Sequence, residues 1–168
     1  MSENACAHVL ALDHHPELAR EVGLILSAFA ILELSPEKIL AKLTRLAESE
    51  AQILSSQFKS FGARIEALEA LLRSRSPDDP DIIVANNLVS RLKKCASIRN
   101  KYAHGLWTEV TTENGSAVRL TGWLPDSRKT VASLVTVASL RDDCAYLRQT
   151  LHLTIDYAWI VVPDVEVR

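Results

Sequence analysis

Apolar residues recur every three or four positions through the first half of the chain, which is the spacing of one buried helical face. The pattern predicts a first helix from Pro16 to about Leu32, since proline suits the first helical position. Ser35-Pro36-Glu37 predicts a cap and a restart, with a short helix to about Ala47. A longer helix is expected from about Glu50 to Arg73. Its inward positions would be Ile53, Leu54, Phe58, Phe61, Ile65, Leu68 and Leu72.

A polar segment, Ser74 to Pro80, separates this helix from the next and predicts a loop. Asp79 is placed to cap a long helix that runs from about Pro80 to His104. Gly105 follows directly and is suited to the left-handed residue that ends many helices.

The pattern changes after Gly105. Asn114-Gly115 is typical of a two-residue hairpin turn, with flanking strands over about 106–112 and 116–123. Such a turn would place Leu106 opposite Trp123. A short third strand is expected through Val131 to Val135. Ser139-Leu140-Arg141-Asp142 resembles a capping box and predicts a last helix that reaches about Val161.

These elements predict a mainly α protein, a helical bundle with a small β-hairpin at about 106–123 before the last helix. The 168 residues are expected to form a single domain, 1–168, and 48% hydrophobic residues with 5% aromatics fit a helical core. Three cysteines without close pairing indicate a reducing compartment. No apolar run approaches the length of a membrane span and no secretory leader is evident, so a cytoplasmic protein is expected.

The candidate chemistry lies at the end of the long helix. The apolar stripe of Ala85, Leu88, Leu92 and Cys95 leads by helical steps to Arg99, a permanent cation where the pattern calls for a hydrophobic residue. An unpaired buried guanidinium is very unfavourable, so Arg99 needs a partner, a solvated cleft or a function.

Two further polar side chains share this surface. Asn100 and His104 lie about 40° apart on a helical wheel, one turn from each other. Lys93 falls on the same line about two turns earlier. The formal net charge of −2 gives no global attraction to nucleic acid, so RNA would need a local basic patch. Its candidate members are Arg91, Lys93, Lys94, Arg99 and Lys101.

The segment Arg99-Asn100-Lys101-Tyr102-Ala103-His104 resembles the Arg-polar-x-x-x-His motif of the HEPN superfamily, the higher eukaryotes and prokaryotes nucleotide-binding domains. The resemblance covers most of the chain, with helices before the motif, a short non-helical excursion after it and a closing helix. It implies a helical bundle that dimerises so that two motifs face each other. Many members are metal-independent ribonucleases of toxin–antitoxin, anti-phage and CRISPR-associated systems, and others have lost activity.

The resemblance therefore implies a homodimeric endoribonuclease with a composite site. His104 would be the general acid or base, Arg99 would hold the phosphate bidentately and Asn100 would orient the imidazole or the substrate. The motif carries over only onto these three residues; Lys93 is a further candidate phosphate contact because of its position on the helix. HEPN toxins paired with nucleotidyltransferase antitoxins carry a tyrosine two residues after the histidine. In those toxins the tyrosine is the target of AMPylation. Leu106 stands there in this chain and cannot be modified in that way, which argues against a nucleotidyltransferase partner and leaves the type of any antitoxin unknown.

Other interpretations stay open. His104 could be a helix-terminal residue that contacts the last carbonyls, and Asn100 could serve only to end the helix. Arg99 could pair with Glu33 or another carboxylate to fix helix packing. Tyr102 fits a core or interface position better than a catalytic one. The whole chain could be a non-catalytic module that binds a nucleotide, RNA or a protein.

Metal and cofactor sites are not expected. Cys6-x-His8 and Asp13-His14-His15 contain ligand types but lack the spacing of a zinc site, and no Gly-rich phosphate loop is present.

Overall fold

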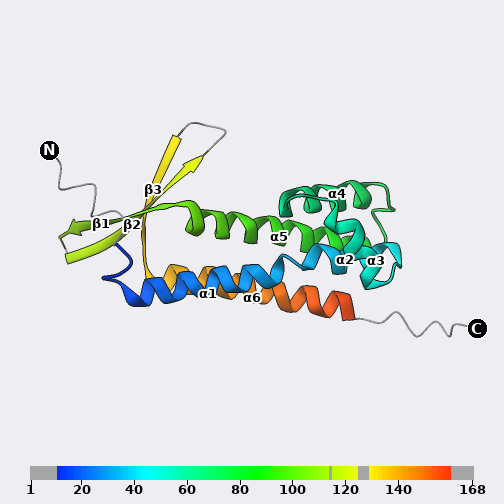
Figure 1. Ribbon diagram of the computed structural model, residues 1–168, viewed down its shortest axis with the longest axis horizontal. Coiled ribbons are helices and arrows are strands. Elements are labelled where there is room, and N and C mark those ends of the chain that lie inside the picture. The colour runs from blue at the N-terminus through cyan, green and yellow to red at the C-terminus, as the bar shows by residue number, and fades with distance from the viewer. Residues whose placement is uncertain (1–10, 114, 125–128, 160–168) are drawn as a thin grey trace, which may run out of the picture. The chain divides into compact units, whose positions relative to one another are not determined.

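The structure is a computed structural model that describes residues 11–113, 115–124 and 129–159. It is mainly helical, with one small three-stranded antiparallel sheet. Figure 1 shows the order of the elements. They are α1 (Pro16–Leu32), α2 (Ser35–Thr44), α3 (Glu48–Ser56), α4 (Phe61–Arg73), α5 (Pro80–His104), β1 (Leu106–Thr112), β2 (Gly115–Leu124), β3 (Lys129–Val135) and α6 (Val137–Trp159).

The chain divides into two compact units, and α1, α5 and α6 each contribute a portion to both. The first unit contains residues 1–28 and 96–146, and the second contains 29–95 and 147–168. The expected hairpin before the last helix is present, but β3 extends it to a sheet of order β1-β2-β3. The expected third strand is thus confirmed.

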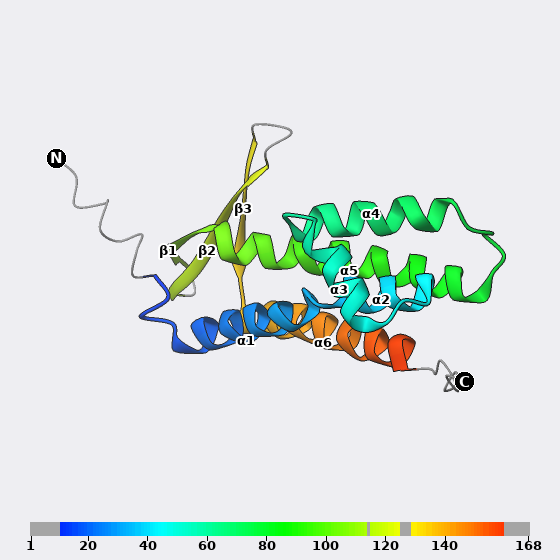
Figure 2. The ribbon, with the colours of Figure 1, turned by 45° about the vertical axis from the view of Figure 1, so that its right-hand side comes forward.

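The second unit is helical. In both views α4 lies beside the first part of α5 (Figure 1 and Figure 2), and the Lys93 ammonium on α5 lies 2.9 Å from Glu69 Oε1 on α4. Its buried apolar residues include Phe29, Leu32, Ile39, Ile65, Leu68, Leu72, Leu88, Leu92 and Leu147. Cys95 is also buried in this unit, and burial raises the pKa of its thiol, which keeps the thiol protonated and unreactive.

The prediction of one helix from Glu50 to Arg73 was wrong, because the chain forms α3 and α4 with a break between them. Ser60 adopts an extended backbone and its side chain accepts a hydrogen bond from the Ala63 amide at 3.2 Å, which caps α4. The break also changes the faces. Three residues expected to point inward, Ile53, Leu54 and Phe58, are exposed.

Helix ends elsewhere follow local backbone chemistry. The short helix α2 ends at Thr44 rather than near Ala47, because Arg45 adopts a left-handed conformation with φ of 56°. The cap predicted for α5 is present, since Asp79 Oδ1 accepts the Asp81 amide at 2.9 Å. The boundaries predicted for the first helix and for α5 agree with the structure.

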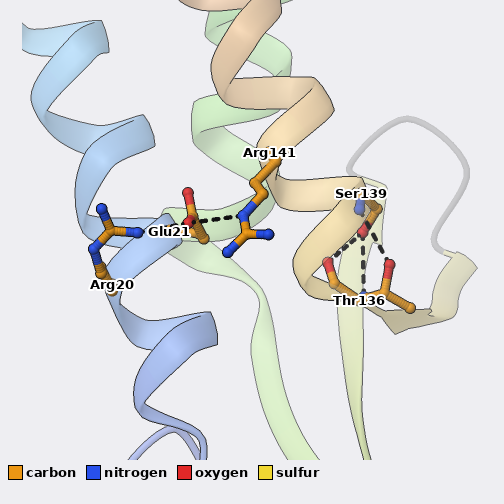
Figure 3. A network of polar contacts seen from close by, with 5 residues as sticks. All are labelled: Arg20, Glu21, Thr136, Ser139 and Arg141. Atoms are coloured by element: carbon orange, nitrogen blue, oxygen red, sulfur yellow. Dashed lines mark hydrogen bonds and ion pairs between the residues drawn. The ribbon is translucent and has the colours of Figure 1, made fainter.

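The last helix begins earlier than predicted. Thr136 and Ser139 form reciprocal contacts, the Ser139 amide donating to Thr136 Oγ1 at 3.1 Å and the Thr136 amide donating to Ser139 Oγ at 3.2 Å (Figure 3). The cap is therefore Thr136, with Ser139 three residues inside the helix, and not Ser139 with Asp142. The predicted end at Val161 lies outside the described residues, which continue the helix to Trp159.

The hairpin register also differs from the prediction. Thr112 pairs with Gly115, so Leu106 lies opposite Thr121, and Trp123 pairs with Thr130 on β3 instead. The predicted clasp between Leu106 and Trp123 is wrong. Because the shift is two residues, each strand position keeps its face of the sheet.

The first unit buries one face of its sheet and the apolar faces of its helical segments. Val118 and Leu120 on β2 and Val135 on β3 are buried, together with Leu18, Val22, Ile25, Ile98, Tyr102, Leu140 and Cys144. Gly105 connects α5 to β1. Its φ lies outside the left-handed region, contrary to expectation, and a Cβ there would lie 2.4 Å from Leu120 Cδ1 and 2.6 Å from the Lys101 carbonyl oxygen. Glycine is required for close approach and not for its left-handed freedom.

Gly105→Ala should therefore lower the free energy of unfolding by about 1–3 kcal/mol, the usual cost of overpacking. Urea titration with circular dichroism measures it. Gly23→Ala is the matched control, since nothing lies within 4 Å of a Cβ at this helical position. It should raise stability by about 0.5–1 kcal/mol because alanine is the better helix former. Equal effects of the two substitutions would contradict this account of Gly105.

Candidate active site

The candidate site occupies the last turns of α5, where the buried stripe of the helix passes beside Arg99 and not through it. Ile98 is 7% exposed and Tyr102 is 2% exposed, and these two residues continue the buried face in the first unit. Arg99 lies at the border of that face and is half-buried. The prediction that the apolar stripe steps from Cys95 to Arg99 was wrong, because steps of three and then four residues from Cys95 reach the buried Ile98 and Tyr102.

The three predicted motif residues come together at this helix end. Arg99 Nη1 donates to Asn100 Oδ1 at 2.9 Å and lies 3.4 Å from His104 Nε2. Asn100 and His104 are both exposed, so the cluster is open to solvent. One guanidinium nitrogen thus links an amide and an imidazole on one surface.

The contact with Arg99 would be a hydrogen bond with only one arrangement of the imidazole. A guanidinium can only donate hydrogen bonds, so a hydrogen bond between Arg99 and His104 needs a lone pair on Nε2. That lone pair is present on Nε2 in the tautomer that carries its proton on Nδ1. Nε2 is then the nitrogen that can accept a proton.

Tyr102 lies on the same helical turns as the cluster and is fixed by contacts with Asp143 and Trp107. Its hydroxyl donates to Asp143 Oδ2 on α6 at 2.5 Å. The Trp107 indole stacks on the Tyr102 ring with centroids 6.0 Å apart, and Trp107 Nε1 donates to the Tyr102 carbonyl at 3.3 Å. Burial, together with the hydrogen bond and charge of Asp143, raises the pKa of Tyr102, so this hydroxyl stays protonated. The prediction that Tyr102 serves the core and not the chemistry is consistent with its 2% exposure.

Two of the other predicted basic residues, Arg91 and Lys93, have structural contacts in the second unit. Lys93 pairs with Glu69 at 2.9 Å. Arg91 donates from Nε to Thr150 Oγ1 at 3.2 Å and from Nη2 to Gln149 Oε1 at 2.8 Å. The role of Lys93 as a phosphate contact stays a prediction. Glu33, the alternative partner considered for Arg99, lies in the second unit, where its main-chain carbonyl accepts from Arg64 at 3.3 Å.

The sequence does not predict a metal site. Across the ranges that the structure describes, no group of three His, Cys, Asp or Glu side chains could hold a metal ion. Cys6 and His8 lie outside those ranges. His15 Nε2 lies 3.6 Å from Glu109 Oε1, and Asp13 and His14 are exposed. Likewise, none of the described helices is long and apolar enough to cross a membrane.

One polar cluster was missed by sequence reasoning. Glu21 on α1 is buried, and its Oε1 accepts from Arg20 at 2.8 Å and from Arg141 at 3.2 Å (Figure 3). A signal was present, because Glu21 sits between Leu18 and Ile25 on the apolar stripe of α1. Its partner on α6 is distant in sequence and could not be inferred from that spacing.

Comparison with protein-family models, with curated proteins and with solved structures finds no match to this chain.

Two buried tyrosines predict alkaline sensitivity. Burial raises the pKa of Tyr157 to about 12, with further contributions from the charges of Asp81 and Asp79, and the pKa of Tyr102 is raised as well. Tyrosines in the unfolded chain ionise near pH 10, so above that pH the unfolded state binds fewer protons than the folded state. The free energy of unfolding should then fall between about pH 10 and 12, by at most about 1.4 kcal/mol per pH unit for each tyrosine.

Denaturant titrations from pH 9 to 11.5 measure this slope. Tyr102→Phe and Tyr157→Phe should each flatten it, because the titrating hydroxyl is gone. Tyr146→Phe removes a third tyrosine hydroxyl and is the control. An unchanged slope in both test variants would rule out these two hydroxyls as its source.

Proposed function

We propose that this chain is a HEPN-type endoribonuclease that cleaves RNA without metal, as a homodimer in the cytoplasm. The observation that carries the proposal is the position of Arg99 Nη1, which lies 2.9 Å from Asn100 Oδ1 and 3.4 Å from His104 Nε2 at an exposed helix end. The mainly helical fold, with the motif at the end of a long helix, supports it.

The reaction is an internal transfer of the phosphodiester. A base removes the proton of the ribose 2′-hydroxyl, and the resulting oxygen attacks the phosphorus. The bond to the 5′-oxygen breaks, and an acid protonates that leaving oxygen. The products are a 2′,3′-cyclic phosphate and a 5′-hydroxyl, with no water consumed and no metal required.

The motif supplies groups for each step. A phosphate is a stronger acceptor for Arg99 than a neutral imidazole, so a bound phosphate would draw the guanidinium away from His104. The lone pair of Nε2 would then be available to the 2′-hydroxyl. Arg99 would hold two phosphate oxygens and stabilise the charge that gathers on them, and Asn100 would orient the ring or the ribose.

A two-fold dimer completes the site. One motif offers a single imidazole, whereas the reaction uses a base and an acid. An isologous interface sets the same surface of two copies face to face, which brings two histidines and two arginines into one cleft. A toxin or phage-defence setting, with an antitoxin of unknown type, follows from the HEPN resemblance alone.

A binding module is the competing function. The contact between Arg99 and His104 would equally suit a site that holds a nucleotide, RNA or a protein without chemistry. Activity measurements separate the two.

His104→Ala should abolish cleavage of mixed RNA in EDTA while changing the free energy of unfolding by less than about 0.5 kcal/mol, as is usual for exposed positions. The readout is the fragment ends, which should be 2′,3′-cyclic phosphates with the wild type. His152→Ala, an exposed histidine in the second unit, is the matched control and should cleave normally. A folded, dimeric wild type that cleaves no RNA would move the assignment to a binding module.

Arg99→Lys should lower kcat/KM by at least about tenfold, because an ammonium cannot form the two parallel hydrogen bonds of a guanidinium. Steady-state cleavage of a labelled oligonucleotide measures it. Arg148→Lys, at an exposed position of α6, is the control for charge-preserving replacement. Near-wild-type activity of Arg99→Lys would exclude bidentate phosphate binding by Arg99.

A further inference from the structure

A second cationic cluster lies in the first unit, around a buried carboxylate. The Glu21 side chain is 5% exposed, whereas the side chains of Arg20 and Arg141 are 67% and 60% exposed. Figure 3 shows the two arginines reaching Glu21 from α1 and from α6. The carboxylate is therefore buried in the protein, and the arginine side chains are exposed to solvent.

Each arginine uses only a small part of its hydrogen-bonding capacity here. Arg20 contacts Glu21 Oε1 through Nη1, and Arg141 contacts the same oxygen through Nε. A guanidinium carries five N–H donors in a fixed plane. Within the described part of the chain, neither guanidinium has another protein partner. Among the described residues, none contacts the Nη1 and Nη2 groups of Arg141, so these groups can bind an acceptor from solution.

The shared oxygen also holds the two cations close together. Arg20 Nη1 lies 2.8 Å and Arg141 Nε lies 3.2 Å from Glu21 Oε1, so these nitrogens are at most about 6 Å apart. Two like charges at this distance repel, and the single carboxylate compensates only one of them. One positive charge stays in excess at an exposed position.

Neutralising the buried Glu21 carboxylate requires one arginine and does not explain the presence of two. A buried carboxylate must be paired, and one guanidinium is enough to neutralise it. The second cation adds repulsion that an anion would relieve. A phosphate group carries several acceptor oxygens and matches guanidinium donors in geometry and charge.

We propose that Arg20 and Arg141, held by Glu21, form a binding site for a phosphate group, and that its source is the backbone of an RNA strand. Only the choice of RNA rests on the function proposed above. Glu21 acts as the positioning residue, because it contacts both guanidinium groups and is itself inaccessible to the ligand.

The first arm of the test measures RNA. Binding of a fluorescent single-stranded 12-nucleotide RNA, methylated at every 2′-oxygen so that it resists cleavage, is followed by anisotropy across a salt series. Arg20→Gln and Arg141→Gln should each weaken binding about 3- to 10-fold and reduce the salt dependence by about one phosphate contact. Arg73→Gln and Arg148→Gln, at exposed helical positions, are matched controls that should leave binding unchanged.

The second arm measures inorganic phosphate alone. Sodium phosphate should raise the Tm of the wild type above its value in sodium chloride of equal ionic strength, because a ligand of the folded state stabilises it. The variant Arg20→Gln/Glu21→Gln/Arg141→Gln removes the cluster without leaving a buried charge unpaired, and should show no such rise.

The outcomes are distinct. Loss of RNA affinity in both single variants supports the site and its source. A phosphate effect that depends on the cluster, with no change in RNA binding, overturns RNA as the source and leaves a site for small phosphates. No effect in either arm overturns the site. RNA binding through the cluster, together with a wild type that leaves unmodified RNA uncleaved in EDTA, would defeat the proposed nuclease and leave this site standing.

Discussion

The hydrogen bond from the Tyr102 hydroxyl to Asp143 ties the end of α5 to α6, and the candidate site is built on that end. A buried hydroxyl without a partner is costly, so the bond and the burial of the ring depend on each other. Trp107 closes the same turn from β1 by stacking on the ring and donating to the Tyr102 carbonyl. Gly105 lets β1 begin within van der Waals reach of Leu120. The motif side chains therefore project from a turn that is held on several sides.

Local chemistry explains which parts of the fold could be predicted. The boundaries of α1 and α5 follow from Pro16, from the Asp79 cap and from apolar spacing, all within a few residues of the helix they define. The division of α3 from α4 could not be read from spacing, because apolar residues continue at helical intervals through it. What decides it is a single capping bond at Ser60, a residue type common in helices and loops alike.

The predictions of the hairpin register and of the start of the last helix were wrong for a related reason. The observed and predicted hairpin turns differ by one residue, and the observed and predicted caps by three, and the local pattern allows either placement. Both registers keep Val118 and Leu120 on the buried face, so their burial does not distinguish the two, whereas the observed pairing of Thr112 with Gly115 does. For α6, Thr136 and Ser139 can both cap a helix, and only their reciprocal bonds identify the first as the cap.

In the candidate site too, contacts within one helix could be predicted and contacts between residues distant in sequence could not. Arg99, Asn100 and His104 share one helix, so their proximity follows from helical geometry and could be predicted. The links from Tyr102 to Asp143 and from Glu21 to Arg141 join residues 41 and 120 positions apart. Spacing could show that Glu21 is out of place on an apolar face. It could not show which arginine, distant in sequence, pairs with Glu21.

The contact between Arg99 and His104 has a consequence for observing the site. While the guanidinium donates to Nε2, the two ring nitrogens differ in protonation, and nitrogen chemical shifts distinguish such tautomers. An anion that attracts Arg99 changes the environment of Nε2 without touching the ring. His104 is thus a built-in spectroscopic reporter of ligand occupancy, whatever that ligand proves to be.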